Sequence, residues 1–126
     1  MTRFAMVALG GALGAVLRYA VSLLPYRGGF PLLTLFTNAA GAVLIGFLAE
    51  TAALHGLSEN ALLFAKTGLC GGFTTFSTFS LESWNLYRAG RGTAAAVYIL
   101  LSVGLCLAGI ALGTLLARKC WQGTVS

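Results

Sequence analysis

Four long apolar segments alternate with short polar ones along the chain. The apolar segments cover residues 4–24, 31–54, 60–87 and 93–117, and glycine, proline and charged residues gather between them. A helix needs about 20 predominantly apolar residues to cross the hydrocarbon core of a bilayer. The pattern therefore predicts an all-α membrane protein with four transmembrane helices, in which residues 1–126 form a single integral membrane domain.

The third apolar segment carries a signal that the other three lack. Gly71 and Gly72 are adjacent near its middle, and β-branched Thr74 and Thr75 follow. Because glycine costs roughly 1 kcal/mol against alanine inside a helix, the pair favours two half-helices joined by a non-helical break. The alternative is a continuous helix whose glycines let a neighbouring helix approach closely, and the sequence does not decide between the two.

Pairs of small residues four apart predict close packing of other helices. Such spacings usually mark helix contacts in membranes rather than chemistry. The pairs are Gly10 with Gly14, Gly68 with Gly72, and Gly109 with Gly113.

The amino-acid composition supports a membrane setting. Hydrophobic residues make up 58% of the chain, charged residues only 9%, and the mean hydropathy is +0.88. A soluble domain carries roughly a quarter charged residues, so lipid is the expected surrounding of this chain. The net charge of +5 comes from basic residues scattered at the segment ends. That distribution fits lipid headgroups, and we expect no nucleic-acid partner.

Basic residues are balanced between the two sides of the predicted bundle, four against four. The first side holds Arg3, Lys66, Arg118 and Lys119, and the second holds Arg18, Arg27, Arg88 and Arg91. The positive-inside rule then gives almost no preferred orientation. Insertion in both orientations favours an antiparallel dual-topology homodimer, because a twofold axis in the membrane plane pairs opposite topologies. The alternative is that one orientation dominates.

Polar side chains follow the two glycines at a depth where hydrocarbon should dominate. Residues 74–82 contain five hydroxyls and one carboxylate. Polar groups inside a membrane are costly unless they face protein or a water-filled path, so they indicate a functional site. Thr78 and Glu82 share a helical face. Phe76 and Phe79 lie three residues apart, and their ring edges, which are positive, can contact an anion, although plain packing is the alternative.

Other polar side chains in the apolar segments extend the candidate site. Asn38 can donate to an anion or join two helices. Arg18 either reaches the membrane surface or sets a positive potential at a vestibule. Tyr98 and Ser102 lie one turn apart on one face, whereas we interpret Lys66 mainly as an anchor at the membrane surface.

Three motifs resemble those of the CrcB/Fluc family of fluoride channels. They are residues 10–19 (GGALGAVLRY), residues 38–41 (NAAG) and residues 71–82 (GGFTTFSTFSLE). They occur in order across essentially the whole chain, and the third is highly specific.

The resemblance implies a function and a set of site residues. Members of the family are dual-topology dimers that conduct fluoride passively, here out of the cytoplasm and across a bacterial inner membrane. A structural sodium ion, which is not transported, would bind the backbone carbonyls of Gly71 and Thr74 at the dimer centre. The pore residues implied are Asn38, Phe76, Phe79, Tyr98 and Ser102, with Ser77, Thr78 and Glu82 as a polar track and Arg18 near a vestibule.

Two other classes of membrane protein remain as alternatives at this stage. A small dual-topology drug or cation exporter needs a membrane carboxylate for proton coupling, and the first apolar segment has none. A purely structural protein would gain little from a hydroxyl-rich break at mid-membrane depth. We expect no enzyme, because the sequence does not suggest a nucleophile, a base and an orienting group that come together.

Overall fold

The computed structural model describes residues 1–122, with the backbone alone for residue 122. The regular secondary structure of this part of the chain is all helical, with no strand. The elements are α1 (Thr2–Ser22), α2 (Leu32–His55), α3 (Glu59–Leu62), the π-helix η1 (Leu63–Cys70), α4 (Gly71–Phe73), α5 (Phe76–Arg88) and α6 (Gly92–Gln122). The predicted all-α fold is therefore confirmed.

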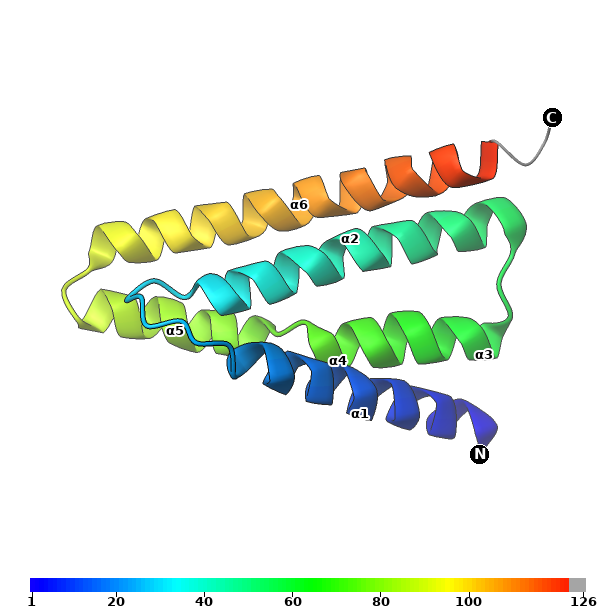
Figure 1. Ribbon diagram of the computed structural model, residues 1–126, viewed down its shortest axis with the longest axis horizontal. Helices are drawn as coiled ribbons and strands as arrows, with labels where there is room; N and C mark the ends of the chain where they lie inside the picture. The colour runs from blue at the N-terminus through cyan, green and yellow to red at the C-terminus, as the bar shows by residue number, and fades with distance from the viewer. Residues whose placement is uncertain (123–126) are drawn as a thin grey trace.

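The helices lie side by side along one long axis (Figure 1). In that view α1 and the segment from α3 to α5 run one way, and α2 and α6 run the other way. Three of the helices, α1, α2 and α6, are long and apolar enough to cross a membrane. The third apolar segment, by contrast, is divided into consecutive pieces.

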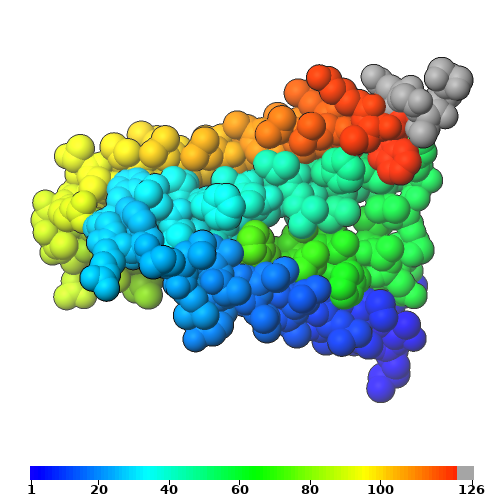
Figure 2. Space-filling view, in the orientation of Figure 1, coloured from blue at the N-terminus to red at the C-terminus, as the bar shows by residue number. Residues whose placement is uncertain are grey.

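Closely packed glycines join α1 to the first half of the third segment. A Cβ added to Gly14 would collide with the Leu69 carbonyl, and one on Gly72 would collide with the Gly11 carbonyl. On the other side of the molecule, Gly113 of α6 lies equally close to the Val43 carbonyl of α2. The packing predicted from the small-residue spacings is confirmed. It leaves two helix pairs with a hollow between α2 and the third segment, as Figure 2 shows.

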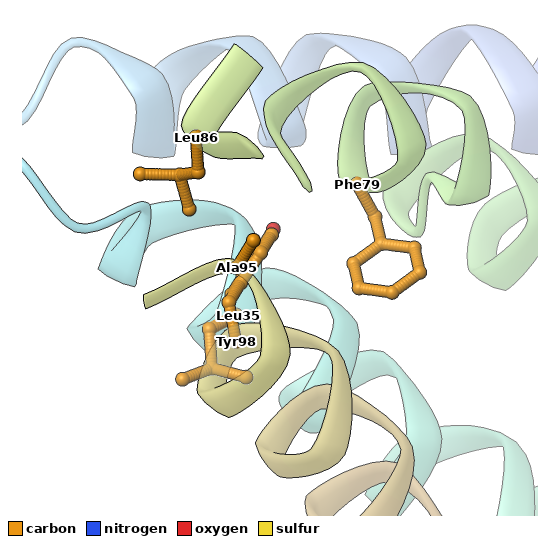
Figure 3. Packing of buried hydrophobic residues seen from close by; sticks show 5 residues of the cluster. All are labelled: Leu35, Phe79, Leu86, Ala95 and Tyr98. Atoms are coloured by element: carbon orange, nitrogen blue, oxygen red, sulfur yellow. The ribbon is translucent and has the colours of Figure 1, made fainter. Parts of the chain in front are cut away.

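A small apolar core fixes α5 against α2 and α6. Its buried members are Leu35, Phe79, Leu86, Ala95 and Tyr98 (Figure 3). Phe79 and Leu86 come from α5, whereas Leu35 belongs to α2 and the other two to α6. This contact holds the second half of the third segment on the α2–α6 pair, while α1 holds the first half.

The third segment is broken, but not at its glycines. Gly71 and Gly72 are helical, and the interruption falls at Thr74 (φ −82°, ψ 157°) and Thr75 (φ −150°, ψ 113°). The expected break is therefore present, just after the glycines, and Gly72 itself serves the close contact with α1. The two threonines suit the extended backbone, since β-branched side chains favour it. We call Thr74–Thr75 the break.

Candidate functional site

Asn38 holds the break through both ends of its side-chain amide. Thr75 N donates to Asn38 Oδ1 at 2.7 Å, and Asn38 Nδ2 donates to the Thr75 carbonyl at 3.1 Å. The extended backbone of Thr75 is thus paired with a side chain of α2 instead of a helical neighbour. Buried backbone groups need such partners. Asn38 therefore joins two elements, and one N–H of its amide serves that contact.

Thr75 also starts the second half-helix. Its Oγ1 accepts a hydrogen bond from Thr78 N at 3.2 Å and donates to Thr78 Oγ1 at 3.0 Å. A threonine in this position satisfies one of the backbone donors that a helix start leaves free. The hydroxyls of Thr75 and Thr78 are consequently ordered at the N-terminus of α5.

The backbone carbonyls before the break have unusual partners. In an uninterrupted helix the Gly71 carbonyl would accept from Thr75 N, but that donor is bound to Asn38. Arg18 Nε donates to the Gly72 carbonyl at 3.1 Å. Arg18 therefore binds the end of the first half-helix, where the helix dipole is negative, and does not simply extend to the membrane surface.

Glu82 is held by two hydroxyls from different helices. Thr34 Oγ1 donates to Glu82 Oε1 at 2.8 Å, and Tyr98 OH donates to Glu82 Oε2 at 2.7 Å. Tyr98 is fully buried. The carboxylate therefore links α5 to both α2 and α6, and its position is fixed by these bonds.

Aromatic rings form a chain beside this network. The centroids of Phe76 and Phe79 are 5.4 Å apart, and those of Phe79 and Tyr98 are 5.2 Å apart. Phe79 is buried, whereas Phe76 is 78% exposed in the single chain. One ring of the pair is thus packed in the core, and the other extends onto an open face.

Two grooves lie beside the break. The polar groove, of about 470 Å³, is lined by Arg18, Thr34, Thr37, Thr75, Thr78 and Glu82 among others. The phenylalanine groove, of about 430 Å³, is lined by Asn38, Lys66, Gly71, Thr75, Phe76, Phe79 and Ser102 among others. Each is large enough for several waters, which occupy about 30 Å³ apiece in the liquid. Thr75 lines both grooves.

Ser102 lines the phenylalanine groove and carries a hydroxyl that is unpartnered in the described part of the chain. Its hydroxyl is buried and has no hydrogen-bond partner within residues 1–122. Leaving a buried hydroxyl unpaired costs about 1–3 kcal/mol, so such a group in a native structure calls for an explanation. A ligand that passes through the groove would supply one.

The structure brings together most of the residues predicted from the sequence, but two predicted pore residues line neither groove. Tyr98 is fully buried and contacts the site through its hydrogen bond to Glu82. Ser77 is exposed and lines neither groove, and its Oγ lies 3.4 Å from Thr75 Oγ1. The predicted polar track therefore contains Thr78 and Glu82 without it, because Ser77 faces another side of α5. The predicted sodium ligand Thr74 lies at the break beside Thr75, and Gly71 lies one turn before it.

Two important residues were not predicted from the sequence. Thr75 caps α5 and lines both grooves, and Thr34 is a hydroxyl partner of Glu82. A sequence signal for Thr75 was available: threonine is a common helix cap, and this one directly precedes the second half of the third segment. For Thr34 the sequence offered no signal, since its contact is made across two helices.

Comparison with known proteins places the chain in a family. The family profile "CrcB-like protein, Camphor Resistance (CrcB)" matches residues 5–114. The chain belongs to the CrcB family. Relatives named "Fluoride-specific ion channel FluC" include one from Ruminiclostridium cellulolyticum, 43% identical over 94% of each chain. Two others come from Hyphomonas neptunium (44% identical, over 94% of this chain and 98% of the relative) and Methanococcus vannielii (37%, over 96% and 100%).

Family membership agrees with the character of the helices. An ion-channel family and several helices able to cross a bilayer together indicate a multi-pass membrane protein. The resemblance based on the motifs is thereby confirmed.

Proposed function

We propose that this protein is a fluoride-specific ion channel that lets fluoride leave the cytoplasm passively and so lowers its intracellular concentration. One observation carries the proposal: the polar groove and the phenylalanine groove are both lined by Thr75, where the third segment is broken. The names of the relatives agree with it.

The donor chemistry of the grooves suits a small, strongly hydrated anion. Hydroxyls of Thr75, Thr78 and Ser102 can replace water around the ion, and the ring edges of Phe76 and Phe79 carry partial positive charge. In the polar groove Arg18 adds a basic side chain, and both Glu82 oxygens accept hydrogen bonds from hydroxyls. A path in which hydroxyls and ring edges contact the ion can select it without trapping it on a fixed charge.

We propose that two inverted copies form the functional unit. Phe76 and Gly71 are exposed in the single chain, next to the break. A second copy that packs on this face would bury them and complete the phenylalanine groove. The balanced basic residues favour the inverted arrangement. In this arrangement both halves of the third segment together make a fourth crossing, and the membrane is the bacterial inner membrane.

A sodium ion at the dimer centre is part of the same proposal. The backbone fits it, because the Gly71 carbonyl has lost its helical donor to Asn38 and the Thr74 carbonyl lies at the break. Carbonyl oxygens suit a hard cation, and the two carbonyls of one chain need those of a second copy to surround it. When bound, the ion would supply a positive charge at the centre. Gly71 and Thr74 would hold it, and it would not be transported.

The exporter alternative lacks support from the site. A proton-coupled exporter needs a carboxylate that binds and releases its substrate, whereas Glu82 is engaged by Thr34 and Tyr98 on both oxygens. A channel instead needs ordered donors along a path.

Flux without a driving proton gradient tests the proposal. We expect purified protein in liposomes to release internal fluoride rapidly when the pH is equal on both sides. Release that requires a proton gradient would favour the exporter, and an absence of fluoride release would refute the channel.

A further inference from the structure

Lys66 is the one charged side chain among the described residues that line the phenylalanine groove. It belongs to η1 and is exposed. Within residues 1–122 no hydrogen bond or ion pair engages its ammonium group. This differs from the two described ion pairs, Arg3 with Glu59 and Arg118 with Glu50, which lie near the helix ends.

The position of Lys66 relates it to the break. It precedes Thr74 by eight positions in the chain, and Cys70 and Gly71 line the groove between them. On α2 and α6 the groove continues to Ile45 and Ile110. The groove is therefore a largely apolar passage with an ammonium group toward one end and the phenylalanines and Ser102 toward the other.

Each groove thus has one basic side chain of its own. Arg18 lines the polar groove and Lys66 lines the phenylalanine groove, and the two grooves share Thr75. Arg18 is bound to the Gly72 carbonyl, whereas Lys66 is free to act on an ion in solution. Ser102 provides an independent observation, because this residue lines the same groove and its buried hydroxyl has no partner within residues 1–122.

We propose that Lys66 is an anion-attracting entry residue: its ammonium group raises the local concentration of fluoride in the phenylalanine groove and delivers the ion toward Ser102, Phe79 and Phe76. The inference rests on the proposed channel function and adds a residue to it. A plain membrane anchor would share the long side chain, but its charge would have no effect on flux.

Ionic strength separates attraction by charge from a structural role. A unit charge about 8 Å from an ion in water-like surroundings changes its local concentration about twofold to threefold. The Debye length is about 30 Å at 0.01 M salt and about 3 Å at 1 M. The contribution of Lys66 should therefore be present in dilute salt and vanish in concentrated salt.

The test measures the initial rate of fluoride efflux from proteoliposomes at about 0.01 M and about 1 M salt. The proteins compared are wild type, Lys66→Gln and Lys66→Arg. Lys119→Gln is the matched control, because Lys119 is an exposed lysine of α6 outside the groove. We expect Lys66→Gln to lose about twofold to threefold in dilute salt, with no loss at about 1 M. Lys66→Arg and Lys119→Gln should keep the wild-type rate.

Two results would overturn the inference. An unchanged rate for Lys66→Gln in dilute salt would remove the charge effect, and an equal loss in Lys66→Gln and Lys66→Arg at both salt concentrations would indicate a structural role instead. Failure of the proposed function itself is distinguishable, since the wild-type protein would then release no fluoride at either concentration.

Discussion

At the residue scale, the site works through side chains that are already ordered by their neighbours. Asn38 fixes the backbone of Thr75, and Thr34 and Tyr98 fix Glu82. A passing ion then meets donors whose positions do not have to be rearranged for each passage. Residues that touch only the core or only lipid should matter much less for flux.

Phe79 is the sharpest residue-scale test of the ring-edge proposal. Its ring lies between Phe76 and Tyr98 and lines the phenylalanine groove. Phe79→Ile keeps an apolar side chain but removes the positive ring edge, so we expect fluoride efflux to fall by more than about tenfold, equivalent to about 1.4 kcal/mol of barrier. The oligomer should survive on size exclusion.

Phe4 offers a matched control for that substitution. It is an exposed phenylalanine of α1, 82% accessible and outside both grooves, so Phe4→Ile should conduct as wild type does. Unchanged flux in Phe79→Ile would remove the ring-edge proposal.

At the element scale, the divided third segment is the feature that creates the site. The half-helix ending in α4 is held by α1, and α5 is held by α2 and α6. The extended Thr74–Thr75 pair is what remains between two separately anchored pieces. The position of the break thus depends on packing as well as on local sequence.

A substitution at Gly72 tests this anchoring. Its missing side chain makes room for the Gly11 carbonyl of α1, so Gly72→Ala should overpack the contact and destabilise the protein by about 1–3 kcal/mol. The measurement is thermal unfolding in detergent. Gly104→Ala is the control, because a Cβ there meets no atom within 4 Å. Equal stability of the two variants would contradict the assigned role of Gly72.

Much of this arrangement could be predicted from the sequence. The apolar segments gave the helices, with α6 continuing past residue 117 to Gln122, and Ser58 caps α3 as its type suggests. The break was predicted near the glycines and lies just after them at Thr74–Thr75. The contact of Gly72 with α1, which keeps the glycines helical, cannot be seen in a linear pattern. The pairing of Thr34 with Glu82 joins residues that are 48 positions apart, and no local rule predicts it.

At the scale of the whole molecule, the single chain exposes apolar surface that lipid and a second copy would cover. Many large apolar side chains are exposed, among them Phe76, Trp84 and Leu100. Lipid can cover most of them. Phe76 and Gly71 are different, since they lie at the site itself, and this is why we propose an inverted partner there.

Topology in native membranes tests the inverted dimer. A single cysteine placed in the loop at Gly28, in a background where Cys70, Cys106 and Cys120 are replaced, should react with a membrane-impermeant maleimide from both sides. We expect roughly half of the molecules to be labelled from each side, because the basic residues are balanced. A separate single-cysteine variant at Glu59, at the opposite end of the helices, is the control. It should also be labelled about equally from the two sides. Labelling from one side only would rule out dual topology.

The most direct test of the central claim is halide selectivity in the same liposomes. Liposomes loaded with potassium fluoride and potassium chloride, at equal pH inside and out, are treated with a potassium ionophore while ion-selective electrodes follow each anion. The channel proposal predicts rapid loss of fluoride while chloride stays inside. Equal release of both halides, or retention of fluoride, would contradict it.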